Sequence, residues 1–219
     1  MWFIWCHRNR HIFDQVDWNL TSILAQANAL LQFSVSAFTS IDCSHRPLPR
    51  LVHWIHPLVD SVALNVDGSR IGTPGRGGYG GLCQNHEGQF LFGFYGFLGE
   101  ASVLQTEILA LLHGLHLCWD KGFRKIVCYS DSTLVVSLLQ GPILMFHRYG
   151  NQLMEIHQLL NCDWTCTVVH TLCEGNSCAD ALARMGALGN DRVVILQEHP
   201  MTLSSLLLAD SLGTVFQRG

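Results

Sequence analysis

The order of strand-like and helix-like segments between residues 62 and 188 is the feature that most restricts the fold of this chain. Three strand-like segments follow one another through short, glycine-rich links, which is typical of an antiparallel meander. Segments with helical periodicity then alternate with two further strands, an order that requires parallel pairing and right-handed crossovers. We therefore expect an α/β fold with a mixed five-stranded sheet, three strands antiparallel and two parallel, flanked by helices.

Local signals place the individual elements. Val62 to Asp67 alternate between apolar and other side chains, as strands do. The first helix should begin at Ser102, where Ser102 and Gln105 fit a capping box, and end near Gly122. The other predicted elements are strands at 78–84, 89–97, 125–130 and 164–170 and helices at 132–140, 148–160 and 176–188.

These elements define a predicted domain over residues 59–190. Residues 1–58 form a flanking segment with a candidate amphipathic helix at 17–33, and its proline-containing part at 39–57 is typical of a linker. We expect this segment to pack loosely or not at all. Residues 191–219 are predicted to be a C-terminal tail.

Composition restricts the compartment and the partners. The longest apolar stretch, residues 134–146, is interrupted and too short to cross a bilayer, so we expect no membrane association. Nine irregularly spaced cysteines and no recognisable leader indicate an intracellular protein of the nucleus or cytoplasm, and we expect a monomer. The four cysteines between 162 and 178 lack the paired spacing of a zinc site. With a formal net charge of -4, nucleic-acid binding would need a local groove, metal ions or a partner.

Four carboxylates fall where the predicted elements meet. Asp67 and Asp131 end the first and fourth strands, Glu107 borders the apolar stripe of its helix, and Asp180 lies in the first turn of the last helix. Sites in such sheets gather at the carboxyl ends of strands. Clustered carboxylates repel one another unless cations neutralise them, and Mg²⁺ prefers oxygen ligands. Taken singly, each acid also fits an ordinary role in a turn, a helix cap or a helix surface.

Four ordered segments resemble type 1 ribonuclease H domains, over roughly residues 63–188. These segments are LNVDGS (64–69) with GRGGYGGL (75–82), QTEILALLHGL (105–115), CYSDSTLVV (128–136) and HTLCEGNSCADALAR (170–184). The flanks WFIWCHRNRHIF (2–13) and HPMTLSSLLLADSLG (199–213) resemble those of plant proteins derived from non-LTR retroelements, in which this domain accompanies a reverse transcriptase.

The resemblance implies four metal-binding acids, a histidine that assists proton transfer or product release, and four residues that contact nucleic acid. In that order they are Asp67, Glu107, Asp131 and Asp180; His170; and Gly68, Ser69, Gln105 and Asn176. The implied reaction is hydrolysis of the RNA strand of an RNA/DNA hybrid with two Mg²⁺ ions, for which Mn²⁺ can substitute. The implied recognition depends on duplex shape and 2′-hydroxyls.

Two other functions stay open. Arg148 is the only lysine or arginine between residues 133 and 163, where bacterial members of the family carry a basic segment. Cys173 stands where many plant relatives have an arginine. Both departures favour a non-catalytic or weakly active nucleic-acid-binding relic of a retroelement. The second alternative is a 3′–5′ exonuclease of the same fold, against which the Asp-Gly-Ser hairpin and His170 argue.

Overall fold

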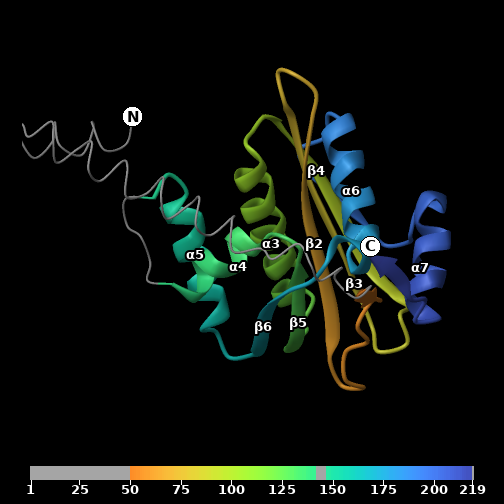
Figure 1. The fold of residues 1–219 in the computed structure, drawn as a ribbon. Coiled ribbons are helices and arrows are strands. Elements are labelled where there is room, and N and C mark those ends of the chain that lie inside the picture. Colours follow the sequence, from red (N-terminus) through yellow and green to blue (C-terminus); the bar gives the residue numbers. More distant parts are fainter. Residues whose placement is uncertain (1–49, 142–146, 219) are drawn as a thin grey trace, which may run out of the picture. The chain divides into compact units, whose positions relative to one another are not determined.

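The computed structural model describes residues 50–141 and 147–218 (Figure 1). The predicted helix at 17–33 and the first part of the predicted linker lie outside these residues. The principal sheet has six strands in the order β6-β5-β2-β3-β4-β7. Their bounds are β2 Val62–Ile71, β3 Arg76–Gln84, β4 Phe90–Glu100, β5 Lys125–Ser130, β6 Thr165–His170 and β7 Val194–Leu196.

The pairing within this sheet is mixed, as predicted. Strands β2, β3 and β4 form an antiparallel meander, whereas β5 pairs parallel to both β2 and β6. The α/β fold with a mixed sheet is therefore confirmed. The predicted number of five strands is wrong, because β7 adds a sixth strand antiparallel to β4. A three-residue strand that pairs along one edge only has no periodicity by which the sequence could reveal it.

Helices cover both faces of the sheet (Figure 1). Helix α3 packs on β2 and β3 on one face and also contacts α4 and α5, whereas α6 packs on β2, β3 and β4 on the other. The bounds are α3 Val103–Asp120, α4 Thr133–Gln140, α5 Gly150–Leu160, α6 Ser177–Leu188 and α7 Ser204–Ser211, with short turns η1 Cys173–Gly175 and η2 Met201–Leu203. Ser102 caps α3 as predicted, because its hydroxyl accepts the Gln105 backbone N–H at 3.2 Å.

Each face of the sheet buries its own apolar cluster. The larger one joins the sheet to α3 and α5 and includes Leu64, Phe94 and Leu111. The smaller one joins β3 to α6 and α7 through Leu82, Leu182 and Leu203 and their neighbours. The glycines of β3 let α6 lie directly on the strand: a Cβ at Gly80 would stand 2.5 Å from the Ala183 backbone nitrogen. The glycine-rich stretch is thus explained by helix–sheet contact.

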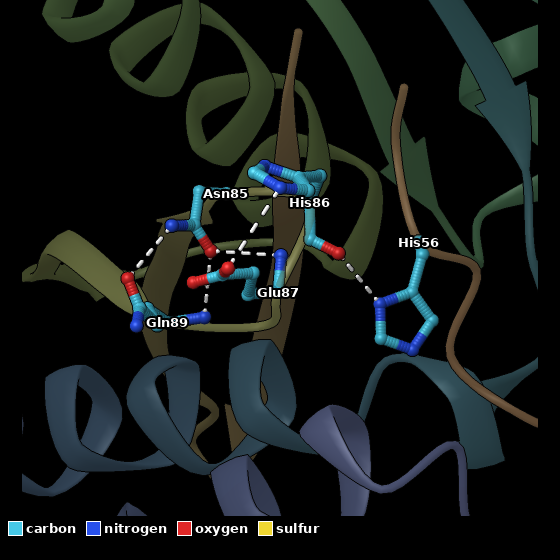
Figure 2. Close-up of polar contacts among 5 residues, drawn as sticks. All are labelled: His56, Asn85, His86, Glu87 and Gln89. Atoms are coloured by element: carbon cyan, nitrogen blue, oxygen red, sulfur yellow. Dashed lines mark hydrogen bonds and ion pairs between the residues drawn. The ribbon is translucent and has the colours of Figure 1, made fainter. Parts of the chain in front are cut away.

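The turn between β3 and β4 is held by one side chain (Figure 2). The Asn85 side-chain oxygen accepts the backbone N–H groups of Glu87 at 3.0 Å and Gln89 at 2.9 Å, as predicted for a turn at this place. The Nδ1 atom of His56 donates to the His86 carbonyl oxygen at 2.9 Å. The segment before β2 is therefore joined to this turn.

Parts of the predicted linker and tail have regular structure. Strand β1 (Arg50–Val52) pairs antiparallel with β8 (Phe216–Arg218) in a two-stranded sheet. Helix α7 contacts α6. The division into residues 1–58, 59–190 and 191–219 stays a prediction. In the part of the chain that the structure describes, no helix is both long and apolar enough to cross a membrane.

Candidate active site and metal centre

Three of the predicted acids converge at one end of the central strands. One carboxylate oxygen from each of Asp67, Glu107 and Asp131 lies within 4.8 Å of the other two. The sheet register explains this meeting, because Val66 on β2 pairs with Ser130 on the parallel strand β5, and an acid follows each of them. Asp131 directly follows β5, as predicted, but the prediction that Asp67 ends its strand is wrong, because β2 stays paired with β3 as far as Ile71. Adjacent parallel strands thus deliver Asp67 and Asp131 to the same edge.

Glu107 is brought to the site by close packing of α3 on β2. A Cβ at Gly68 would lie 2.5 Å from the Glu107 backbone nitrogen, so only glycine permits this approach. The Gly68 backbone N–H donates to the Glu107 carboxylate. Glu107 is 7% exposed, and its Oε2 atom has no hydrogen-bond partner among the described residues. A buried carboxylate oxygen without a donor fits a cation ligand.

The electrostatics of the cluster favour protons or cations. Burial, reinforced by the charges of Glu107, Asp131 and Asp180, raises the pKa of Asp67 far above its ordinary value. Burial and the Asp131 charge raise the pKa of Glu107 to about 8, against the opposing hydrogen bond from Gly68. A hard divalent cation would replace these protons and relieve the repulsion, so the oxygen-only ligand set fits Mg²⁺ or Mn²⁺.

Asp180 lies beside this trio without joining it. It stands in the first turn of α6, and its charge contributes to the raised pKa of Asp67. Its carboxylate instead accepts the Nε–H of Arg184 at 3.0 Å, one helical turn along, and its side chain is 45% exposed. The structure therefore brings three predicted metal ligands together and leaves the fourth close by, paired with an arginine.

Two residues at the end of β6 border Asp131. The exposed His170 has its Nε2 atom 3.2 Å from the Asp131 carbonyl oxygen, so its ring stands at the rim of the site. Cys173, the first residue of η1, is predicted only as a departure from the family pattern and not as a neighbour of Asp131. A hydrogen bond to the Asp131 carboxylate, together with burial, raises the pKa of this thiol to about 11. All cysteines in the described residues are free thiols.

The predicted nucleic-acid contacts divide into two groups. Gly68, Ser69 and Gln105 are partly exposed beside the carboxylates. Gln105 also lines a depression together with Arg70, Arg148 and Glu100. Asn176, by contrast, is 2% exposed, and its side chain has partners inside the protein. Its contact with nucleic acid remains a prediction.

Comparison with known proteins identifies the family. A sequence model described as reverse transcriptase-like matches residues 65–186, more than half of the chain. The chain belongs to the reverse transcriptase-like family. A curated Arabidopsis thaliana protein, whose name marks it as a provisional ribonuclease H protein, is 31% identical to this family member over 172 residues. That match covers 77% of this chain but 27% of the Arabidopsis protein, so the chain spans about a quarter of its relative's length.

Solved structures agree on the fold of this family member. RNase H1 from the archaeon Halobacterium salinarum is 26% identical with a TM-score of 0.52, covering 57% of this chain and 96% of the archaeal one. The N-terminal RNase H domain of a Mycobacterium tuberculosis protein is 23% identical with a TM-score of 0.54, covering 58% and 93%. LC11-RNase H1, solved with an RNA/DNA hybrid, is 22% identical with a TM-score of 0.53, covering 57% and 96%. The resemblance to ribonuclease H domains is confirmed.

Proposed function

We propose that this protein is a divalent-metal-dependent endonuclease that hydrolyses the RNA strand of RNA/DNA hybrids. The observation that carries the proposal is the trio of Asp67, Glu107 and Asp131, whose oxygens lie within 4.8 Å of one another, with the buried Glu107 Oε2 unpaired among the described residues. Kinship with proteins named as ribonucleases H, one of them solved with a hybrid, supports this choice of substrate.

The side chains have separable roles in the proposed reaction. Asp67, Glu107 and Asp131 would hold a cation, and Asp180 would add a further carboxylate ligand if its bond to Arg184 opened. When bound, two Mg²⁺ ions, or Mn²⁺ in their place, would activate the attacking water and stabilise the departing 3′-oxygen. His170, exposed at the rim, accepts or returns a proton as the product leaves.

The duplex would lie against the residues around the carboxylates. Gly68 and Ser69 present backbone and hydroxyl groups there, and Gln105 stands beside them. Asn176 is the fourth predicted contact, and its burial means that the η1 turn would have to move before its side chain could reach a hybrid. Few fixed cations line this surface among the described residues, so binding should be weak, and because few counterions are released it should depend only modestly on salt.

We further propose that the protein acts as a monomer in the nucleus or cytoplasm. The free thiols throughout the described part of the chain support a reducing compartment.

Cleavage of a labelled RNA/DNA hybrid tests the proposal. The full chain is incubated with the hybrid and Mg²⁺ at low salt, next to Asp67→Asn and to Asp163→Asn as a charge-matched control at an exposed position. We expect wild type and Asp163→Asn to cleave the RNA strand internally and Asp67→Asn to be at least about a hundredfold slower. Shortening of the strand from its end would indicate an exonuclease instead.

A nucleic-acid-binding relic is the second candidate. The observation that favours it is Cys173, whose thiol occupies the Asp131 carboxylate with a hydrogen bond. If folded wild type binds the hybrid but cleaves it with neither Mg²⁺ nor Mn²⁺, the relic is the correct description and the proposed enzyme is wrong.

A further inference from the structure

A buried chain of hydrogen bonds links the segment before β2 to the site. The Trp54 indole Nε1–H donates to the Asn65 side-chain oxygen at 3.0 Å. The Asn65 amide then donates to the Asn176 side-chain oxygen at 3.0 Å. The Asn176 amide in turn donates to the Val66 carbonyl oxygen at 2.9 Å. These three side chains, Trp54, Asn65 and Asn176, are defined here as the amide relay.

The amide relay ends next to two of the predicted metal ligands, Asp67 and Asp180. Val66 directly precedes Asp67 on β2. Asn176 is the N-cap residue of α6, and its backbone carbonyl accepts the Asp180 backbone N–H at 3.1 Å. The side chain of Asn176 is thus bonded to β2, and its backbone to the first turn of α6, which carries Asp180.

The side chains of the amide relay are buried, so their hydrogen bonds have no alternative partner in the solvent. Trp54 is 3% exposed, while Asn65 and Asn176 are each 2% exposed, so no bulk water can replace a lost partner. A buried amide that loses its hydrogen bond is left desolvated without a partner, which destabilises the protein. These three side chains therefore have one low-energy arrangement. The η1 turn is fixed from the same side, since Gly175 packs against the His53 carbonyl oxygen.

We propose that Trp54 is a positioning residue of the active site, acting through Asn65 and Asn176 to place Asp180 beside the carboxylate trio. The residue lies in the stretch that the sequence analysis assigns to a linker, so the functional unit begins before β2. This inference rests on the metal centre of the proposed function, although it does not require that hybrids be the substrate.

Trp54→Phe in the full chain tests the proposal, because it keeps an aromatic ring and removes only the donor. Trp164→Phe is the matched control, since the Trp164 indole N–H also donates to a partner, the Leu159 carbonyl oxygen at 2.7 Å, away from the acids. Mn²⁺ binding is measured from the electron paramagnetic resonance signal of the free ion, and thermal unfolding is followed in parallel.

We expect Trp54→Phe to bind Mn²⁺ about tenfold more weakly, as loss of a hydrogen bond that orients a metal ligand does elsewhere, and Trp164→Phe to bind it like wild type. In hybrid cleavage, Trp54→Phe should lower kcat and leave KM unchanged. Unchanged Mn²⁺ affinity in folded Trp54→Phe, with only a lower melting temperature, would show a purely structural role and overturn the proposal.

Asn65→Ala keeps the question decidable if Trp54→Phe does not fold. Asn65→Ala breaks the amide relay at its centre and should weaken Mn²⁺ binding at least as much. Where Trp54→Phe does fold, adding it to Asn65→Ala should cause no further loss, whereas additive losses would mean that Trp54 acts by another route. Failure of wild type to cleave hybrids would refute the proposed function alone, because Mn²⁺ binding is read separately.

Discussion

Asp67 and Glu107 are buried carboxyls whose environment opposes their ionisation. They lie beside Asp131, and no basic side chain of the described residues forms an ion pair with these three acids; Arg184 pairs with Asp180 instead. This arrangement lowers the stability of the metal-free protein, and binding of a cation restores the lost stability. Metal binding and folding stability are therefore coupled through these carboxyl groups.

Replacing Asp67 should therefore stabilise the metal-free protein. We expect Asp67→Asn to increase the free energy of unfolding at pH 8 by more than about 1.4 kcal/mol, the equivalent of one pKa unit. Urea unfolding in the presence of EDTA measures this gain, with Asp163→Asn as the control. A decrease for Asp67→Asn would mean that the carboxyl makes favourable contacts in the folded protein.

The pH dependence of stability has a definite sign. Raised pKa values of Asp67 and Glu107 mean that the folded chain keeps protons that the unfolded chain releases above about pH 4. These two groups therefore lower the stability of the metal-free protein progressively from about pH 4 to about pH 8. Thermal unfolding in EDTA across this range should show the loss, and Asp67→Asn should flatten it.

Metal affinity should rise with pH, because the carboxyls must lose the same protons before they can bind a cation. Because Glu107 must lose its proton and its pKa is raised to about 8, Mn²⁺ affinity should increase about tenfold or more between pH 6 and pH 8. Calorimetry in two buffers of different ionisation enthalpy measures the released protons. If the Mn²⁺ affinity did not change with pH and no protons were released, the assignment of Glu107 as a metal ligand would be wrong.

At the scale of elements, the site depends on how closely α3 and α6 approach the sheet. Gly68 admits α3 and Gly80 admits α6, and these two contacts place Glu107 and Asp180. A glycine-rich strand is usually weak, yet here its missing side chains are replaced by the backbone of a helix. The glycines of β3 therefore form a packing surface for α6.

A methyl group at Gly80 should separate α6 from β3. We expect Gly80→Ala to destabilise the protein by about 1–3 kcal/mol through overpacking against the Ala183 backbone. Gly141→Ala is the control, because its added Cβ would meet its nearest neighbour at an ordinary 3.5 Å. Chemical denaturation distinguishes the two; equal stabilities would mean that α6 moves aside at little cost.

At the scale of the whole molecule, the segment after α6 is part of the packed structure. Strand β7 adds a sixth strand at the edge of the sheet, and the fully buried Leu203 packs with Leu82 and Leu182. The Asp210 carboxylate accepts hydrogen bonds from Gln84 Nε2 and Cys178 Sγ, both at 3.3 Å, which joins α7 to β3 and α6. These contacts predict that the C-terminal segment unfolds together with the sheet.

Leu203→Ala tests this cooperativity. We expect a loss of about 2–5 kcal/mol in a single transition, because a buried leucine is replaced by a cavity. Leu212→Ala, at a side chain that is 71% exposed, should change stability by less than about 0.5 kcal/mol. Urea unfolding followed by fluorescence and circular dichroism should give coincident curves, whereas two separate transitions would mark the segment as an independent unit.

The sequence by itself determined the element order between residues 62 and 188, the mixed pairing of the sheet, and the assignment of Asp67, Glu107 and Asp131 to a strand, a helix and a strand end, because strand alternation and helix periodicity are local patterns. The tertiary structure decided that the strand of Asp67 continues to Ile71. Only the tertiary structure decided that β7 joins the sheet, that Asp180 pairs with Arg184, and that Asn176 faces inward to Asn65 and Trp54. The pairing of β7 and the contacts of Asn176 join residues far apart in the chain, and such contacts leave no periodic trace in a single sequence. Asp180 and Arg184 are only four residues apart, but whether Asp180 pairs with Arg184 or joins the carboxylate trio depends on how α6 packs on the sheet.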